Sequence, residues 1–321
     1  MCIYYSLYII EMERHQTKEY HVISDGILLG IYVYICAALA NHERNIPEHL
    51  RYIDTYPSNN LVQEDSDADS PWEFDASHWV NDPEKSTDIV PFSHGGHANI
   101  MLIRRCTDNK KTDIEIYDPY GPMYRWEARM YPEASRNRVI KNMRAALLST
   151  MVPETTTVIY PSGVHPQQVQ IERTTTKVMF NEDVKENTES WVDNLCMFWS
   201  ALVVLLWYKT SKKLSLDKIG STLALAMKND PGLDISTGIL PFVDYLSRVG
   251  TKIYKSQEEN GSEPVDPNQV KRMIQDQPKP DLIRTIQTVI QKSACKTQEG
   301  AMDQLMECIK AILKDFPRSK P

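Results

Sequence analysis

Hydrophobic positions fall into two long apolar runs, separated by shorter segments of strand-like character. Residues 26–41 and 195–208 are apolar almost throughout, and their lengths predict two buried helices. Four shorter segments between them are rich in β-branched residues or alternate in polarity, which is typical of strands. These are residues 88–92, 98–105, 113–118 and 155–160. The pattern therefore predicts an α+β fold in which a small sheet packs on buried helices.

The middle two strand segments predict a β-hairpin. Residues 100–103 form a continuous apolar run that predicts burial on both faces of a sheet. The polar residues 107–110 are typical of a short connection between paired strands. Because a hairpin brings its two outer ends together, we expect His97, at the start of the first strand, to lie beside Asp118, at the end of the second.

Downstream of residue 208 the chain is predicted to be helical. Ser215, Thr237, Asp281 and Thr297 each stand where a helix cap is expected. A further amphipathic helix is predicted earlier, at residues 133–151. Polar composition predicts loops or linkers in three other places. These are the acidic residues 64–69, the segment 161–193 and residues 256–269.

Composition and charge exclude several classes of protein. With 321 residues, 41% of them hydrophobic, the chain has the make-up of a globular protein. A net charge of −7 argues against nucleic acid as a primary partner, because binding phosphates needs a basic face. The six dispersed cysteines favour reduced thiols and a reducing compartment. The charge-free apolar run at residues 26–40 is too short to span a bilayer, so no membrane insertion is expected.

Cys196 stands where a polar, acidic segment changes into the apolar run 195–208. In the first turn of a helix, free N–H groups and the macrodipole favour a thiolate. The simpler interpretation of this cysteine, taken alone, is a small residue in the core. A nearby imidazole and a carboxylate that orients it would make the thiol a nucleophile, and His97 and Asp118 supply that pair. His94 and His97 would form half of a metal site, but no third ligand stands at a suitable spacing.

Three motifs occur in a fixed order along the chain. Residues 95–99 read Gly-Gly-His-Ala-Asn, residues 117–121 read Tyr-Asp-Pro-Tyr-Gly, and residues 196–200 read Cys-Met-Phe-Trp-Ser. In these motifs the chain resembles the adenain and ubiquitin-like-protease clan of papain-like cysteine peptidases. It is still more similar to large-DNA-virus proteins with His-Ala-Asn, acidic-Pro-His-Gly and Cys-x-x-Trp-Ser motifs. Those proteins often carry a Gly-Pro-Gln segment, which residues 165–167 resemble.

The resemblance implies roles for four residues: His97 as general base, Asp118 as the group that orients it, Cys196 as nucleophile and Gln167 as oxyanion-hole donor. It implies a papain-like core, in which a small antiparallel sheet packs on a central helix that starts at the cysteine. The chain departs from the clan in having Met197 after the cysteine and a long acidic segment between Gln167 and Cys196. Gln168, Gln170 and Asn194 therefore remain alternative oxyanion donors.

The expected function is a thiol-dependent peptidase that cleaves precursor or ubiquitin-like protein substrates, bound in extended conformation and without a cofactor. Capsid or virion proteins are among the partners that the resemblance implies, and the virion or the host cytoplasm is the implied location. Two alternatives stay open: a catalytically silent virion or host-interaction protein that keeps the fold, and an acyltransferase with the same His-acid-Cys order.

Four segments make up the expected domain organisation. Residues 1–85 form an N-terminal hydrophobic and helical extension with the acidic loop, and residues 86–254 form the peptidase-like core. Residues 255–280 are predicted to be a flexible linker, and residues 281–321 a C-terminal helical pair.

Overall fold

The computed structural model describes most of the second half of the chain and the strands and one helix of the first half. The described residues are 25–40, 61–63, 72–74, 87–94, 97–106, 111–121, 156–180, 195–260, 266–289 and 297–318. Several predicted segments lie outside these ranges: the acidic loop 64–69, the hairpin connection 107–110 and the helix 133–151.

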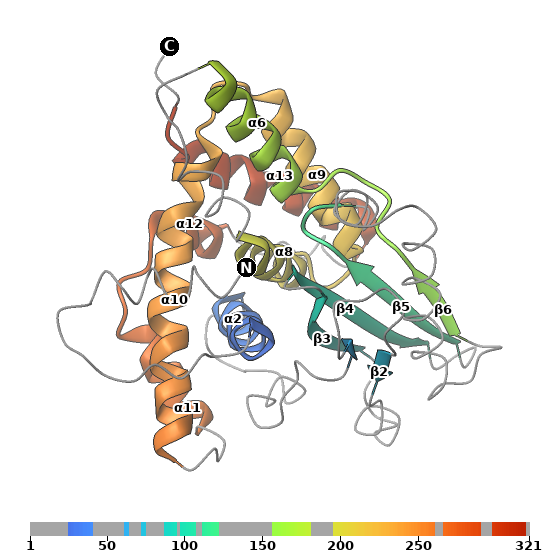
Figure 1. Cartoon of the computed structure of the whole chain (residues 1–321), viewed down its shortest axis with the longest axis vertical. Helices are drawn as coiled ribbons and strands as arrows, with labels where there is room; N and C mark the ends of the chain where they lie inside the picture. Colours follow the sequence, from blue (N-terminus) through green and yellow to red (C-terminus); the bar gives the residue numbers. More distant parts are fainter. Residues whose placement is uncertain are drawn as a thin grey trace.

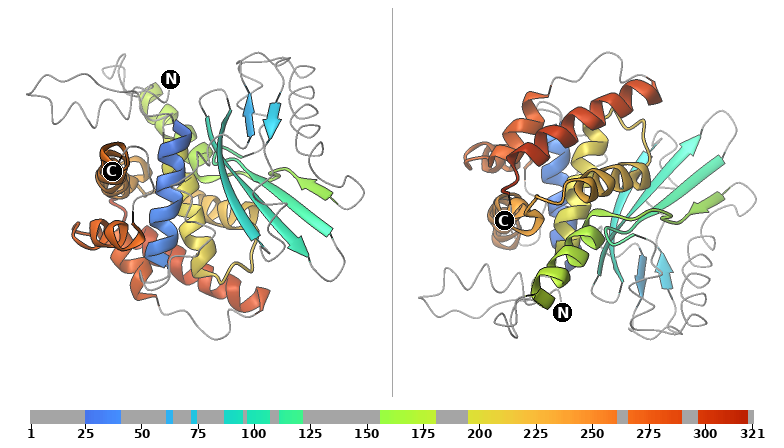
Figure 2. Two further views of the ribbon diagram at one scale, coloured as in Figure 1. Left: turned by 90° about the horizontal axis from the view of Figure 1, so that it is seen from below. Right: turned by 90° about the horizontal axis from the view of Figure 1, so that it is seen from above.

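The described part of the chain has an α+β architecture with a four-stranded mixed sheet and eight helices. Two helices, α2 (Asp25–Ala40) and α8 (Cys196–Lys209), lie side by side next to the sheet. Helices α10 (Ile235–Glu259) and α12 (Asp281–Thr288) cover them on the side away from the sheet, and α13 (Gln298–Asp315) lies across one end of the pair (Figures 1 and 2). The buried helix pair predicted from the two apolar runs is thus confirmed as the centre of the fold.

The sheet has the strand order β3-β4-β5-β6. Strands β3 (Thr87–His94), β4 (His97–Cys106) and β5 (Lys111–Tyr117) pair antiparallel, which confirms the predicted hairpin. Strand β6 (Thr156–Ile159) pairs with β5 in parallel, so the prediction of a purely antiparallel sheet is wrong. The chain between β5 and β6 has the dozen or more residues that a parallel crossover requires, which a hairpin turn does not provide.

Side chains along β4 point alternately to the two faces of the sheet, and both faces are buried here. Ala98, Ile100 and Leu102 belong to the same apolar cluster as α2 and α8. Met101 and Ile103 alternate with them and are also fully buried, although they lie outside that cluster. Burial on both faces, predicted from the continuous apolar run, is therefore confirmed. A separate two-stranded sheet, β1 (Leu61–Gln63) with β2 (Trp72–Phe74), was not predicted.

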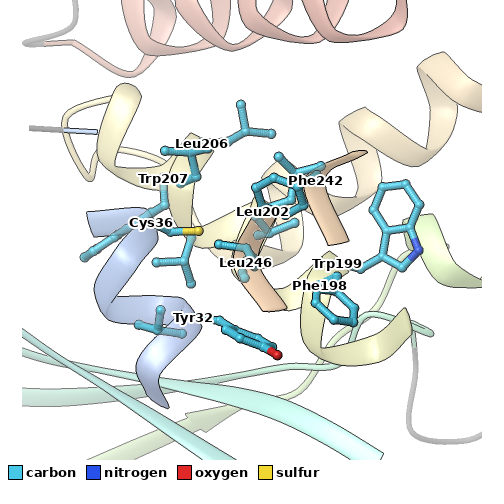
Figure 3. Packing of buried hydrophobic residues seen from close by; sticks show 14 of the residues in the cluster. Tyr32, Cys36, Phe198, Trp199, Leu202, Leu206, Trp207, Phe242 and Leu246 are labelled. Atoms are coloured by element: carbon cyan, nitrogen blue, oxygen red, sulfur yellow. The ribbon is translucent and has the colours of Figure 1, made fainter. Parts of the chain in front are cut away.

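Helix α8 is buried along its whole length, as expected for a helix that is apolar on every side. Its Phe198 stacks on Tyr32 of α2, with ring centroids 5.2 Å apart (Figure 3). Helix α10 packs closely against the Tyr32 ring at Gly250. A Cβ atom at this position would lie only 2.7 Å from the ring. The three helices α2, α8 and α10 therefore form one tightly packed core.

Helix caps explain where several elements begin. Ser215 accepts a hydrogen bond from the backbone N–H of Lys218 at the start of α9 (Leu216–Asn229), and Thr297 caps α13 in the same way, as predicted. Two predicted caps are wrong. Helix α10 begins at Ile235 and its N-cap is Asp234, whose carboxylate accepts a hydrogen bond from the backbone N–H of the predicted cap, Thr237. Helix α12 has Pro280 at its N-cap rather than Asp281, which lies in the first turn.

Two segments predicted to be irregular are helical. Helix α6 (Pro166–Phe180) occupies much of the predicted loop 161–193, and its first residue is a proline, which suits the first turn of a helix. The predicted linker 255–280 contains the end of α10 and all of α11 (Pro267–Gln275). Asp266 caps α11 and a proline again opens it, so the linker prediction is wrong for these residues.

No helix among the described residues is both long enough and apolar enough to cross a membrane.

Candidate active site

Three segments that carry predicted site residues meet at one end of the sheet. The turn after β5 contains Asp118, the first turn of α6 contains Gln167, and Cys196 opens α8. The backbone N–H of Gln167 donates a hydrogen bond to the carbonyl of Pro119 at 3.1 Å, which joins α6 to the turn. One turn further along each helix, the indole N–H of Trp199 donates to Gln170 at 2.6 Å, which joins α8 to α6.

Asp118 lies directly after β5 and is 2% exposed. Its carboxylate accepts a hydrogen bond from the backbone N–H of Tyr120 at 2.8 Å, and its carbonyl accepts one from Gly121 at 3.0 Å. Gly121 has a φ of +106°, a conformation that residues with a side chain rarely adopt. The Asp-Pro-Tyr-Gly motif therefore forms a tight turn that fixes the Asp118 backbone and one carboxylate oxygen.

Cys196 is the first residue of α8, as predicted, and its side chain is completely buried. It is one of three fully buried cysteines outside any disulfide among the described residues, together with Cys36 and Cys308. No side chain caps the start of α8 at Leu195. The first turn of a helix is a position where the macrodipole favours a thiolate. Cys36 lies in mid-helix, where burial raises the pKa of its thiol.

His97 is the first residue of β4, and its side chain lies outside the described part of the chain. The strand register nevertheless places its backbone. The last pair between β4 and β5 joins Ile100 to Tyr117, so His97 and Asp118 both lie at this end of the two strands. This is the position that the hairpin predicts. The hydrogen bonds of a Cys196–His97–Asp118 triad remain a prediction.

The glutamines of α6 differ in their contacts. Gln168 donates to Glu172 at 2.8 Å, and Gln170 accepts from Trp199, so both side chains are engaged within the helix packing. Gln167 is equally buried and belongs to the turn that contacts Pro119. Gln167 as oxyanion donor stays a prediction, and Asn194 lies outside the described residues.

A buried charged cluster beside Asp118 was missed from the sequence. The ring of His165, 0% exposed, contacts the Asp118 carbonyl through Nδ1 and Asp217 of α9 through Nε2, the latter at 3.0 Å. It also stacks on Tyr117, with centroids 4.8 Å apart. The only sequence signal for His165 was its place before Pro166 and Gln167, and Asp217 stands more than 50 residues away.

Hydrogen bonds keep Asp217 ionised. Burial alone would raise the pKa of its carboxyl group. The hydrogen bond with His165 and the backbone N–H groups of Ser162 and Gly163 outweigh burial and lower this pKa to about 2. The hydroxyl of Ser162 also lies 3.1 Å from the second carboxylate oxygen. Asp217 is thus a stable anion at neutral pH.

Glu115 of β5 extends the cluster. Its carboxylate accepts a hydrogen bond from the backbone N–H of Asp217 at 2.9 Å and lies 3.6 Å from the Arg104 guanidinium. Burial raises the pKa of Glu115 above its ordinary value, against the effect of this hydrogen bond and of Arg104. Glu115 therefore anchors the start of α9 to the middle of the sheet.

The described residues contain no group of three His, Cys, Asp or Glu side chains arranged to hold a metal ion. No family model, no curated protein and no solved structure matches the chain.

Proposed function

We propose that this chain is a thiol-dependent peptidase with a papain-like core, and that Cys196 is its nucleophile. The observation that carries the proposal is the meeting of three segments at one end of the sheet. The turn of Asp118, the first turn of α6 and the first turn of α8 are joined there by the Gln167–Pro119 and Trp199–Gln170 hydrogen bonds. Two of the three motifs that suggested a peptidase, at residues 117–121 and 196–200, are thus linked to each other through α6.

The chemistry follows from the residue types. The Cys196 thiolate attacks the scissile carbonyl and forms a C–S bond, while Gln167 donates a hydrogen bond to the oxyanion. His97 transfers a proton to the leaving amine as the C–N bond breaks, and Asp118 orients the imidazole. Water then hydrolyses the thioester and regenerates the thiol. We propose a protein substrate in extended conformation, either a precursor or a ubiquitin-like protein.

Burial of the Cys196 side chain supports a second candidate function. A substrate carbonyl must reach Sγ, and the side chain is 0% exposed in this structure. A catalytically silent protein that keeps the peptidase fold, as a virion component or a host-interaction protein, does not need such access. The two functions differ in one measurable property, the reactivity of the Cys196 thiol in the folded protein.

Cysteine alkylation separates the two functions. The folded chain is treated with a limiting amount of iodoacetamide at pH 7, and modification at each cysteine is quantified by peptide mass spectrometry. Cys36 and Cys308 are internal controls because both lie outside any disulfide and are fully buried, as Cys196 is. A peptidase requires Cys196 to react at least tenfold faster than both controls, since only a thiolate that a ligand can reach is nucleophilic.

Substitution of His97 by Ala refines the measurement. In a peptidase, loss of the imidazole lowers the alkylation rate of Cys196 and leaves the rates of Cys36 and Cys308 unchanged. If Cys196 in the wild-type protein is as unreactive as the two controls, the nucleophile assignment fails and the silent protein is the better account.

A further inference from the structure

The buried cluster around His165 has a hydrogen-bonding pattern that fixes its protonation. The ring contacts two oxygen atoms, the Asp118 carbonyl at Nδ1 and the Asp217 carboxylate at Nε2. A carbonyl oxygen and an ionised carboxylate only accept hydrogen bonds. Each ring nitrogen must therefore carry a hydrogen, and a neutral imidazole has only one. Its second nitrogen would direct a lone pair at an oxygen.

The surroundings of the ring suit a cation. Asp217 is held as an anion by the backbone N–H groups of Ser162 and Gly163, so it supplies a counter-ion in direct contact with Nε2. The Tyr117 ring lies against the imidazole face at 4.8 Å, a geometry that favours a positive charge over an aromatic face. Asp118, directly after β5, and the Glu115–Arg104 pair behind Asp217 are further charged groups of the same cluster.

Both nitrogens of His165 are occupied, so His165 is not available as the base for Cys196. What it does is hold neighbouring segments together. Its Nδ1 contacts the carbonyl of Asp118, the residue before the turn that Gln167 also contacts. Its Nε2 contacts α9 through Asp217, and its own backbone carbonyl accepts from Val169 in the first turn of α6. One side chain thus links β5, α6 and α9.

We propose that His165 is a doubly protonated positioning residue that, with Asp217, fixes Asp118 relative to Gln167. The catalytic consequence rests on the proposed peptidase function, whereas the protonation and the positioning do not.

Substitution of Asp217 by Asn tests the clamp. The asparagine oxygen can still accept from the backbone N–H groups of Ser162 and Gly163 and from Nε2, which all contact the same oxygen of Asp217. The asparagine carries no charge, so a doubly protonated His165 loses its counter-ion and a neutral ring with one N–H is expected. Ser162→Ala is the matched control, because it removes one hydroxyl contact to the same carboxylate and leaves Asp217 anionic.

The first readout is the ¹H–¹⁵N correlation spectrum of the histidine rings in the labelled full-length protein at pH 7, with His165→Gln used for assignment. Wild type and Ser162→Ala are expected to show two protonated nitrogens for His165, and Asp217→Asn one protonated and one unprotonated nitrogen. An unprotonated nitrogen in the wild-type spectrum, or no change in Asp217→Asn, overturns the proposal.

The second readout is positional. Hydrogen exchange at the Tyr120 and Gly121 amides, which both bind Asp118, is expected to be at least tenfold faster in Asp217→Asn than in Ser162→Ala. Equal exchange in the two variants contradicts a positioning role.

The third readout is kinetic and uses a fluorogenic peptide built on a sequence that the wild-type protein cleaves. Asp217→Asn is expected to lower kcat roughly tenfold to a hundredfold at nearly constant KM, because it misplaces a catalytic group without touching the substrate. A rise in KM alone contradicts the proposal. If the wild-type protein cleaves nothing, the peptidase function fails, and the spectrum and the amide exchange still decide the clamp.

Discussion

Asp217 shows how one carboxylate ties the protein's stability to pH. Hydrogen bonds from His165, Ser162 and Gly163 lower its pKa to about 2, against the effect of burial. An acid whose pKa is lower in the folded state than in the unfolded state stabilises the folded protein at pH values above its unfolded-state pKa, here 3.8. That contribution is lost as the pH falls from about 4 to about 2.

Substitution of Asp217 by Asn is expected to remove this dependence. At pH 7 the variant should unfold with a free energy lower by about 1–2 kcal/mol, since hydrogen bonds to a charged group are lost. Between pH 4 and pH 2 the difference from wild type should shrink, because the wild-type carboxylate becomes protonated. Urea unfolding at a series of pH values measures this. A difference that stays constant across the window would mean that Asp217 does not titrate as described.

At the residue scale, the sequence placed individual side chains well where a local pattern defines the position. Cys196 opens α8 and Asp118 follows β5, because the change from polar to apolar residues and the Asp-Pro-Tyr-Gly turn are local signals. His165 and Asp217 could not be paired in this way. Their contact joins α6 and α9 across 52 positions and depends on how these helices pack.

At the scale of elements, Gly250 shows how closely α10 crosses α2. A Cβ on Gly250 would meet the Tyr32 ring at 2.7 Å, and this ring is itself stacked on Phe198. The ring has little room to move because both neighbouring helices are fully packed. The contact between α10 and α2 therefore requires glycine at this position.

Gly250→Ala is expected to lower the free energy of unfolding by about 1–3 kcal/mol through overpacking, despite the better helix propensity of alanine. Arg248→Ala on the same helix is the matched control. Its partly exposed ion pair with Asp244 should contribute less than about 0.5 kcal/mol. Chemical denaturation of the two variants and the wild type measures both effects. A Gly250→Ala protein as stable as the control would contradict the close crossing of α10 and α2.

Elements differed in how far the sequence predicted them. Strands β3 to β5 and helix α8 followed from apolar pattern alone, because their burial is continuous or alternates with the period of a strand. Helix α6 did not, since its sequence is polar and contains three consecutive threonines. Its helical form is supported by contacts with distant partners, including Trp199 and the Arg173 hydrogen bonds to carbonyls at the end of α9. The direction of β6 likewise depends on the path of a long connection.

At the scale of the whole molecule, the helices before and after residues 86–254 belong to the same core as α8. Residues of α2, α12 and α13 share the buried apolar cluster with α8 and the sheet. Figure 2 shows α2 and α8 side by side, with α10 on their far side from the sheet and α13 across one end of the pair. The core around α8 is therefore built from α2 as well as from the helices after residue 254.

The central claim is that this fold presents Cys196 as a nucleophile toward peptide bonds. The most direct test is to incubate a proteome-derived peptide library with the wild-type protein or with Cys196→Ala, and to identify new peptide termini by mass spectrometry. The account predicts a defined set of cleavages with the wild-type protein that is absent with Cys196→Ala and retained with Cys36→Ala. The same cleavages with Cys196→Ala, or none with the wild-type protein, would contradict it.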